Sequence, residues 1–381
     1  MMTRLGDVCT VISGSTPKTS VAEYWDGDIK WITPAELNED SFYLYDSQRH
    51  ITELGKEKTG LSYMPIGTVI LSSRAPIGKT AIAGCEMCCN QGFKNLICSD
   101  DIFNEYLYYF LKGKTDYLNS LGRGATFKEI SKSIVENIEI RLPALEEQKQ
   151  IARQFGGIYR LISLRKQQLA RLDELVKARF VELFGDTILN PFGWKKDLLG
   201  TVCDVRDGTH DSPQYYESGY PLVTSKNVTG GKIDLTDCSL ICEADFKKIN
   251  ERSKVDIGDI IMPMIGTVGK PVIVDIEPNF AIKNVSLIKF KADSRVLNTY
   301  IRALLQSDYF DDAVLSKVRG GTQKFISLGD IRKLEVLVPP MELQEQFATF
   351  IKQTDKSKLA IQQSLDKLET LKRSLMQKYF G

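Results

Sequence analysis

The segment RGGTQKFISLGDIRKLEVLVPPMELQEQFA, which begins at Arg319, repeats an earlier segment, RGATFKEISKSIVENIEIRLPALEEQKQIA, which begins at Arg123. The two segments lie 196 positions apart (319 − 123), and identical residues recur at this offset as far as Gly185 and Gly381. No insertion or deletion interrupts the alignment. Two segments that shared only their composition would not keep one register over such a length, so the chain is a tandem duplication.

The composition sets limits on the class of protein. The chain has 381 residues, of which 43% are hydrophobic and 26% charged, and this suits two globular domains of ordinary size. Its net charge is only +1. A protein that binds nucleic acid alone usually has a clear basic excess. The composition therefore permits a DNA binder only if it has local basic patches or shares its DNA contacts with a partner.

Nothing in the sequence indicates a membrane span or a metal centre. No run of eighteen apolar residues occurs, and the first residues lack the apolar core of a signal peptide. We therefore expect a cytoplasmic protein with no membrane contact, in which the eight cysteines are reduced thiols. Cys85 and Cys88 form a C-x-x-C, but no second pair follows at zinc-ribbon spacing, so no metal ligands are predicted.

Each half begins with a part that has the pattern of a β-sheet. The segments GTVILSSRAPIGKTAIAG from Gly67 and GDIIMPMIGTVGKPVIVD from Gly258 align with each other, at an offset of 191 (258 − 67). Short strands rich in Val and Ile, separated by Gly and Pro turns, predict a twisted, mostly antiparallel sheet. Helical stretches follow at 104–121 and 298–315. Together they predict an α+β domain in each half.

Each half ends with a long heptad-patterned helix. In the first copy the apolar rows carry Ile151, Phe155, Ile158, Ile162, Leu169, Leu172, Val176 and Leu183. Such rows predict a coiled coil, and duplication favours pairing of the two helices in antiparallel fashion. The alternative is that each helix packs on its own domain. A helix of about 40 residues is roughly 60 Å long and would suit a spacer between two DNA-reading modules.

At this point the residues resemble a known family, the specificity subunits of type I restriction–modification enzymes. The resemblance rests on ISGSTPKTSVAEYWDGDIKWITPAEL from Ile12, RDGTHDSPQYYESGYPLVTSKNV from Arg206, the paired RGxT segments, and the helix starts LPxLEEQ and PPMELQEQ. It covers essentially the whole chain. It implies a target-recognition domain at 1–144, a central conserved spacer helix at 145–187, a second target-recognition domain at 188–340 and a C-terminal spacer helix at 341–381.

The resemblance also implies a function and partners. Such a subunit has no catalytic residues. It reads a bipartite double-stranded DNA target with its two recognition domains and holds two copies of the methyltransferase subunit on its helices, and a motor-nuclease restriction subunit can join. S-adenosylmethionine would be bound on the modification subunit, and ATP with Mg on the motor subunit. Because the two recognition regions match poorly outside the shared motifs, an asymmetric target is expected.

Three segments resemble enzyme motifs only superficially. SRAPIGKT has Ser73 where a P-loop needs its first glycine, and NPFG at Asn190 lacks the second proline of an amino-methyltransferase motif. In GTHDS the candidate triad members His210, Asp211 and Ser212 are adjacent, whereas triad residues converge from separate loops. The sequence therefore predicts a non-catalytic protein.

The repeated Gly-rich loops have a composition suited to gripping phosphates, because glycine lets backbone N–H groups approach closely and Arg, Thr and Lys donate. The alternative is that these glycines only form a turn and the charges are solvated. The predicted phosphate-binding residues are Arg123, Thr126, Lys128, Arg319, Thr322 and Lys324, with Lys79 and Lys270 as a second tier. Candidate base readers, chosen where the halves differ, are Lys18, Arg74, His210, Lys226 and Gln323. The predicted seam residues of the helices are Leu169, Leu172, Leu365 and Leu368.

Two other functions fit the same sequence. The first is a specificity subunit of a related system in which restriction and modification are fused on one partner polypeptide. The second is a coiled-coil scaffold whose α+β domains bind protein rather than DNA. Sequence-selective, salt-dependent DNA binding by the assembled complex would separate the scaffold from the other two.

Overall fold

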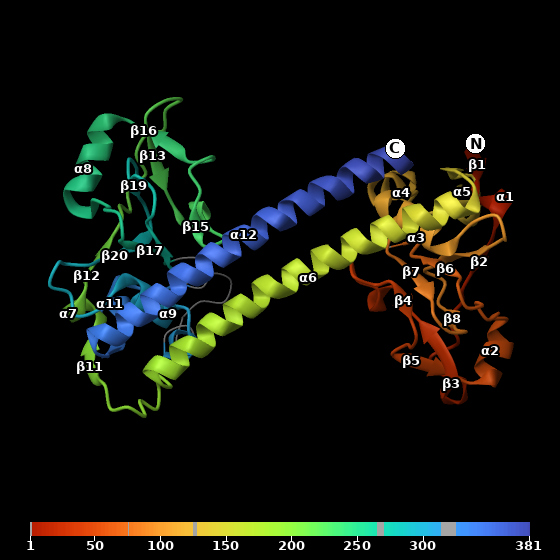
Figure 1. Ribbon diagram of the computed structural model, residues 1–381, viewed down its shortest axis with the longest axis horizontal. Helices are drawn as coiled ribbons and strands as arrows, with labels where there is room; N and C mark the ends of the chain where they lie inside the picture. The colour runs from red at the N-terminus through yellow and green to blue at the C-terminus, as the bar shows by residue number, and fades with distance from the viewer. Residues whose placement is uncertain (1, 75, 125–127, 265–269, 314–324) are drawn as a thin grey trace. The chain divides into compact units, whose positions relative to one another are not determined.

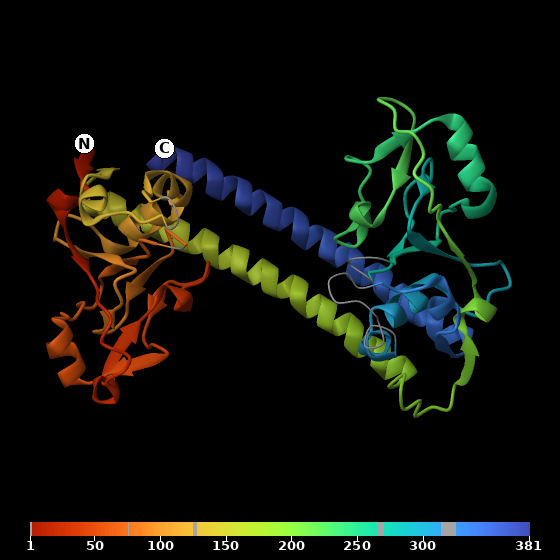
Figure 2. The same ribbon diagram turned by 180° about the vertical axis from the view of Figure 1, so that it is seen from behind.

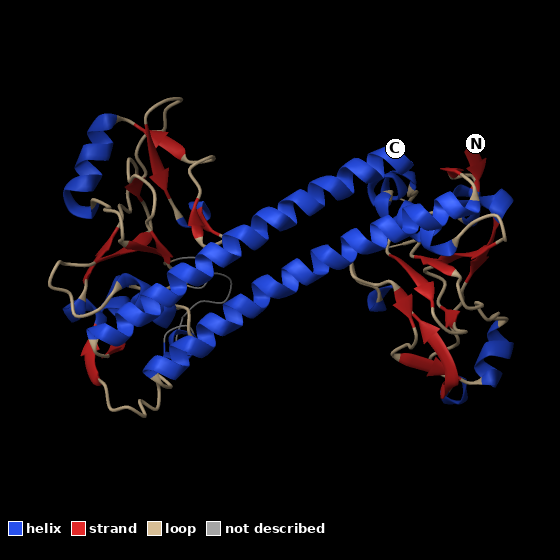
Figure 3. Ribbon diagram, viewed as in Figure 1, coloured by secondary structure: helices blue, strands red, loops and turns tan. Residues whose placement is uncertain are grey.

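The computed structural model describes residues 2–74, 76–124, 128–264, 270–313 and 325–381. They form two compact units: unit 1 combines Met1–Lys166 with Gln363–Gly381, and unit 2 is Gln167–Gln362. Both units mix helices with strands, as Figure 3 shows. The expectation of two duplicated α+β domains is therefore confirmed in its broad outline.

The strands and short helices of unit 1, labelled in Figure 1, come in one order along the chain. They are β1 (Met2–Arg4), α1 (Leu5–Val8), β2 (Cys9–Ser13), η1 (Ala22–Tyr24), β3 (Trp25–Ile32), η2 (Pro34–Glu36), β4 (Tyr43–Leu44), β5 (Arg49–Ile51), α2 (Glu53–Thr59), β6 (Val69–Leu71), β7 (Thr80–Ala83), β8 (Cys88–Cys89), β9 (Lys94–Cys98), α3 (Asn104–Gly113), α4 (Thr115–Leu121), α5 (Lys132–Glu136) and β10 (Glu139–Arg141).

Unit 2 repeats this order with few changes. Its elements are β11 (Lys195–Leu198), α7 (Leu199–Val202), β12 (Asp204–Asp207), β13 (Tyr220–Val223), η3 (Ser225–Asn227), β14 (Val228–Thr229), β15 (Lys232–Ile233), β16 (Ser239–Ile241), α8 (Glu243–Ser253), β17 (Ile260–Pro263), β18 (Val272–Ile273), β19 (Ala281–Ile282), β20 (Val285–Lys289), α9 (Asn298–Leu305), α10 (Asp308–Ala313), α11 (Leu328–Arg332) and β21 (Glu335–Val338).

The sheets of the two units share their strand order, although the larger sheet has five described strands in unit 1 and four in unit 2. In the described residues of unit 1, a five-stranded sheet has the order β2-β9-β6-β7-β4 and a three-stranded sheet the order β5-β3-β8. The counterparts in unit 2 are β12-β20-β17-β18 and β16-β13-β19. Most strand pairs are antiparallel, as the turn-rich pattern predicts, but β3 with β8, β4 with β7 and β13 with β19 are parallel. In each unit an additional pair, β1 with β10 or β11 with β21, precedes a long helix.

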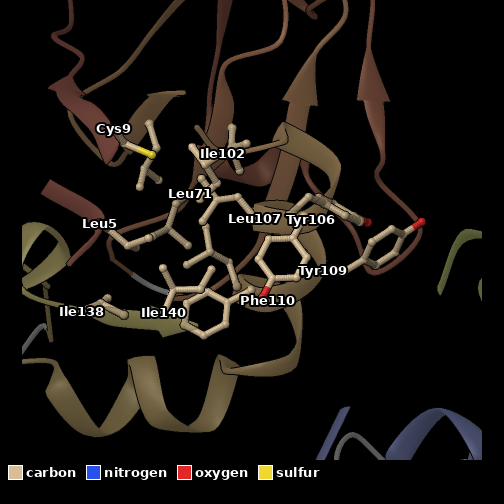
Figure 4. Close-up of a cluster of buried hydrophobic side chains, with 14 of the residues drawn as sticks. Leu5, Cys9, Leu71, Ile102, Tyr106, Leu107, Tyr109, Phe110, Ile138 and Ile140 are labelled. Carbon is tan, nitrogen blue, oxygen red and sulfur yellow. The ribbon is translucent and has the colours of Figure 1, made fainter. Parts of the chain in front are cut away.

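The main core of unit 1 lies between the five-stranded sheet and α3. Figure 4 shows Tyr106, Leu107 and Phe110 of α3 close to Leu5 and Leu71, and all of these side chains are buried. The face of α3 toward the sheet is almost wholly apolar, so the hydrophobic effect fixes this helix on the sheet. In unit 2 the same position is taken by α9, whose Tyr300 and Leu304 are buried.

Two helices, α6 (Leu145–Phe184) and α12 (Met341–Phe380), are each 40 residues long. In unit 1 the first turns of α6 pack against the last turns of α12: the rings of Phe155 and Phe380 are stacked with their centroids 5.5 Å apart. Figures 1 and 2 both show the end of α12 beside α4. In unit 2 the last turns of α6 meet the first turns of α12, where the rings of Phe184 and Phe347 are 5.5 Å apart. Within each unit the two helices therefore run in opposite directions.

Each helix end is also fixed to the core of its unit. Phe380, at the end of α12, packs on Tyr106 with a centroid distance of 5.2 Å, and Phe184, at the end of α6, packs on Tyr300 at 4.7 Å. Within each unit, the ends of the two helices therefore contact both each other and the core of that unit.

The duplication extends to buried hydrogen bonds. Gln148 of α6 accepts a hydrogen bond from the backbone N–H of Phe103 at 2.8 Å and donates to the carbonyls of Asp101 and Pro143, both at 2.9 Å. Gln344 of α12 makes the equivalent bonds in unit 2, to Leu297, Arg295 and Pro339. Each glutamine is fully buried and joins the start of its helix to the loop before α3 or α9.

Candidate nucleic-acid interface

The Gly-rich loop of unit 1 is closed by a pair of backbone hydrogen bonds between Arg123 and Glu129, both 3.0 Å long. Gly124 has a φ of +129°, which favours glycine. The side chains of Arg123 and Lys128 are exposed, as phosphate contacts require, whereas Thr126 lies outside the described residues. The equivalent candidates of the second half, Arg319, Thr322, Gln323 and Lys324, also lie outside the described residues.

This loop lies beside the turn that joins β8 to β9. The backbone N–H of Ile130 donates to the carbonyl of Ser73 at 2.9 Å, and the N–H of Ser73 donates to the carbonyl of Gly92 at 2.8 Å. Lys94 forms an ion pair with Glu129 at 3.2 Å. Half-buried Arg74 is held in the same place by backbone pairing with Glu129. Arg74, a candidate base reader, and Arg123, a predicted phosphate contact, are thus brought onto one edge of the larger sheet.

Next to this edge, two polar side chains meet. The hydroxyl of Thr16 donates to Oε1 of Gln91, which is exposed on the β8–β9 turn. Thr16 is placed by Gly14, where a Cβ would come within 2.1 Å of the Cys89 carbonyl oxygen. Only glycine fits there. The candidate base reader Lys18 is exposed two residues after Thr16.

Unit 2 has a corresponding arrangement with different chemistry. His210 lies between two oxygens: Nδ1 is 2.9 Å from Oδ1 of Asn284, and Nε2 is 2.9 Å from Oδ2 of Asp207. The bonds to Asn284 and then to Asp207 raise the pKa of His210, because both favour the protonated ring. Asp207 is buried and is also paired with Arg252. The equivalent glycine is Gly208, whose Cβ would lie 2.4 Å from the Ile282 carbonyl oxygen.

The remaining candidates are placed less distinctively. Lys79 donates from Nζ to the carbonyls of Leu37 at 2.6 Å and Pro34 at 3.3 Å, so it already has partners within the domain. Lys270 is exposed, and Lys226 is exposed on η3. Of these three lysines, Lys79 lies in unit 1, and Lys226 and Lys270 lie in unit 2.

A cavity of about 530 Å³ lies in unit 1 and includes Lys79, Lys112 and Lys372 in its lining. Lys112 donates to the Glu39 carbonyl and to the hydroxyl of Tyr108, both at 2.6 Å. Burial lowers the pKa of Lys112 to about 8. Glu39, Asp40 and Glu369 share the lining, so the cavity has mixed charge.

The apparent enzyme motifs have ordinary structural roles. Within SRAPIGKT the backbone N–H of Gly78 donates to the Ser72 carbonyl and the N–H of Lys79 to the Ser72 hydroxyl, which closes the β6–β7 turn. A strand follows, whereas a P-loop leads into a helix. In GTHDS the hydroxyl of Ser212 accepts a hydrogen bond from Lys283 at 2.6 Å rather than from His210. Asn190 of NPFG bonds to the backbone of Trp194 within a loop.

The cysteines behave as buried or half-buried thiols, and all eight are free. Burial raises the pKa of Cys88 to about 11 and of Cys89 to about 12, which disfavours the thiolates that a metal would need. Within the described ranges, no three His, Cys, Asp or Glu side chains come together as a metal site. In that same part of the chain, no helix has both the length and the apolar character to cross a membrane.

The predicted seam residues lie on the less exposed rows of the long helices. Leu365 is 8% exposed, and Leu169, Leu172 and Leu368 are half-buried. Nearby, Lys358 of α12 forms an ion pair with Asp173 of α6 at 2.5 Å within unit 2.

Sequence reasoning missed Thr16, Gln91, Asp207 and Asn284. The available signal was weak. Gly14 and Gly208 stand in the opening motifs of the two halves, and the residues two positions later, Thr16 and His210, differ. The turn residues Gln91 and Asn284 carry no motif, and only the fold brings them to these loops.

Comparison with known proteins finds relatives that match nearly the whole chain. The model of the type I restriction modification DNA specificity domain matches residues 1–174 and again residues 191–373. The type I restriction enzyme MjaIX specificity subunit of Methanocaldococcus jannaschii is 31% identical, over 98% of this chain and 91% of that protein. The EcoKI specificity subunit of Escherichia coli K12 is 22% identical, over 98% of this chain and 86% of that protein.

Solved structures share the fold. The type I S subunit from M. genitalium aligns with a TM-score of 0.61 at 15% identity, covering 100% of this chain and 96% of that one. A chain from a structural study of complex assembly in the type I R-M system aligns with a TM-score of 0.60 at 19% identity, covering 100% and 97%. With both of its halves matched and its full length shared with such relatives, the chain belongs to the family of type I restriction–modification DNA specificity subunits.

Proposed function

We propose that this chain reads a bipartite, asymmetric DNA target for a type I restriction–modification enzyme, each recognition domain reading one half. The proposal rests on one observation: the two units share the same buried hydrogen bonds at the start of the long helices but differ in the side chains of the loops after Gly14 and Gly208. Gln148 and Gln344 make the same bonds, whereas Thr16 with Gln91 and His210 with Asn284 differ at corresponding loops. A shared framework with different exposed chemistry suits two readers of different half-sites.

In this proposal α6 and α12 form an antiparallel coiled-coil spacer that sets the gap between the half-sites. The helices also hold two methyltransferase subunits. Support comes from a leucine pair related by the duplication offset: Leu175 of α6 is 49% exposed and Leu371 of α12 is 47% exposed. Exposed leucines at equivalent positions of two long helices provide two similar apolar contact points, as two copies of one partner require.

The chemistry of modification and restriction would belong to the partners. S-adenosylmethionine would be bound by the modification subunit, and ATP with Mg by a motor-nuclease restriction subunit. The near-neutral charge of this chain, +1 overall, suggests that part of the DNA affinity comes from the methyltransferase subunits. Equally tight binding of the site by the isolated chain and by the assembled complex would contradict that division.

The test of the proposed function is a map of modified adenines in a host that carries this chain with its methyltransferase partner, before and after deletion of this gene. We expect a split motif of two short half-sites around a fixed gap that disappears on deletion. An unchanged methylome, together with no sequence-selective DNA binding by the purified complex, would favour the protein-binding scaffold instead.

The docking proposal has its own test. Leu175→Glu and Leu371→Glu should each remove one methyltransferase subunit from the complex, and the double variant should remove both. Native mass spectrometry of the purified assembly measures this stoichiometry. Ala170→Glu, at an exposed position of the same helix α6, is the matched control and should leave two subunits bound.

A further inference from the structure

In both units a tightly packed glycine, Gly14 or Gly208, is followed two residues later by a side chain that reaches a turn. This turn leads into β9 in unit 1 and into β20 in unit 2. The loops follow the same course: the N–H of Ser15 donates to the Cys89 carbonyl at 3.1 Å, and the N–H of Thr209 donates to the Ile282 carbonyl at 3.0 Å. Thr16 then meets Gln91, and His210 meets Asn284. In each domain the fold thus brings an amide side chain of this turn into contact with the loop after the glycine.

These amides still have hydrogen-bonding capacity to spare. In each pair the amide oxygen contacts the partner residue, and among the described residues no hydrogen bond is made by the NH₂ group of Gln91 or Asn284. Gln91 is exposed and Asn284 half-buried. An amide presents a donor and an acceptor side by side, which is the pattern that pairs with the edge of adenine in the major groove.

The turn in unit 1 also adjoins the predicted phosphate contacts. Gln91 immediately precedes Gly92, whose carbonyl is bound by Ser73, and Ser73 leads directly to Arg74. The Gly-rich loop of Arg123 is attached to this strand end through Ile130. A side chain here would approach base edges while the neighbouring basic residues contact the backbone of the same DNA.

The pair of His210 and Asn284 can change with protonation, whereas the pair of Thr16 and Gln91 cannot. Both ring nitrogens face oxygen atoms, and a ring that donates from both must be protonated. When the proton on Nδ1 is lost, the Asn284 amide must turn to donate its NH₂ to that nitrogen, and its oxygen then faces outward. The hydroxyl of Thr16 can donate or accept, so Gln91 can keep either orientation without a proton.

The hydrogen-bond partners of His210, first Asn284 and then Asp207, favour its protonated form. Asp207 accepts from Nε2 directly, and the hydrogen bonds raise the pKa of the imidazole, which Arg252 opposes. The other charged groups that share its surroundings in the described structure, on its own loop, on α8 and on the β19–β20 turn, are Asp211, Asp245, Lys248 and Lys283.

We propose that Gln91 and Asn284 each read one base pair, in the first and the second half-site respectively, and that His210 determines which face of the Asn284 amide the DNA meets. The inference rests on the proposed function, since it assumes that the two domains read DNA. It predicts that one position of the second half-site changes its base preference with pH, from an acceptor-bearing edge at low pH to a donor-bearing edge at high pH.

The experiment uses the full chain assembled with its methyltransferase subunits and a set of duplexes that carries every single-base change in both half-sites. Relative affinities are measured at about pH 6 and about pH 8, on either side of the ordinary pKa of histidine. We expect the preference at one position of the second half-site to shift by roughly fivefold or more. His210→Gln should remove the shift, and the first half-site is the internal control.

Side-chain variants assign the two positions. Asn284 has a φ of +56°, so Asn284→Gly removes the amide without backbone strain, and Asn284→Asp keeps its shape but leaves acceptors only. Each should alter preference at one position of the second half-site, and Gln91→Ala should do so in the first. Gln48→Ala, an exposed glutamine of the same unit, should leave both half-sites unchanged.

Two failures are distinguishable. Unchanged preferences in the Gln91 and Asn284 variants, with sequence selectivity intact, would overturn this inference alone. A uniform loss of affinity for all duplexes would do the same, because it is the behaviour of a phosphate contact. Absence of selectivity in the wild-type complex would overturn the proposed function as well.

Discussion

At the scale of single residues, the buried Gln148 joins the loop before α3 to the start of α6. Replacement by leucine preserves bulk but leaves one N–H and two carbonyls without their partner. Each such group costs about 1–3 kcal/mol when it stays buried, and partial relaxation reduces the sum. We expect Gln148→Leu to lower the free energy of unfolding by about 2–4 kcal/mol.

Chemical denaturation measures this loss. Gln150→Leu is the matched control, because Gln150 is exposed on the same helix, and its effect should stay within about 0.5 kcal/mol. An equal effect of the two substitutions would show that the hydrogen bonds of Gln148 are not the cause.

Lys112 gives a pH dependence with a definite sign. Burial lowers its pKa to about 8, whereas an unfolded lysine titrates near 10.4. Between these values the unfolded chain binds more protons, so this residue's contribution to stability rises with pH and is lost as pH falls through about 8. The melting temperature of the wild type minus that of Lys112→Met should therefore increase between about pH 8 and about pH 10. A flat difference would contradict the shift.

Residues of the candidate nucleic-acid interface could be predicted from the sequence only where a motif occurs in both halves of the chain. Gly124 and the exposed Arg123 could be located because RGxT occurs twice. The pairing of Thr16 with Gln91 could not, since it joins residues 75 positions apart and depends on how two loops fold over Gly14. The repetition of Lys79 predicts a phosphate contact, and the sequence gives no sign that its ammonium group also donates to two carbonyls of its own domain.

At the scale of elements, α6 continues unbroken through Gly156 and Gly157. A Cβ at Gly157 would meet nothing within 4 Å, whereas one at Gly156 would lie 3.2 Å from the Tyr109 hydroxyl. Alanine in the middle of a helix is favoured over glycine by about 0.5–1 kcal/mol. Gly157→Ala should stabilise the protein by about that amount. Thermal unfolding checks this, and Gly156→Ala should give a smaller gain or none.

Leu172 tests the contact between the helices in unit 2. It is half-buried beside Asp173, which is paired with Lys358 of the other helix. Leu172→Glu should place a charge in this apolar row, disrupt the helix pairing and abolish assembly with the methyltransferase. Adenine methylation in cells reports the outcome, and Ala170→Glu on the exposed side is the control. Normal methylation by the Leu172 variant would contradict the spacer proposal.

The long helices could be predicted from sequence because heptad rows persist over many turns and prolines precede both starts. The sheets were predictable in kind but not in detail. Strand pairing such as that of β3 with β8 joins segments separated by more than fifty residues, and no local pattern encodes that it is parallel.

At the scale of the whole molecule, each unit is completed by a helix end that belongs to the other half of the sequence. Phe380 stacks on Phe155 and Tyr106 in unit 1. Phe380→Ala should therefore destabilise unit 1, by about 3–5 kcal/mol, although the residue follows the second domain in sequence. Hydrogen exchange should show faster exchange in α3 than in α9.

Phe184→Ala is the reciprocal variant, because Phe184 packs on Tyr300 in unit 2. It should accelerate exchange in α9 and leave α3 protected. If both variants loosened the same unit, the assignment of helix ends to units would be wrong.

The late completion of unit 1 has a consequence for synthesis on the ribosome. Lys166 and Gln363 are 197 positions apart (363 − 166), and translation at about 5–20 residues per second needs roughly 10–40 s to cover them. During that time the aromatic surface around Tyr106 waits for Phe380. A nascent chain released before its last turns would leave this aromatic surface exposed to proteases and chaperones.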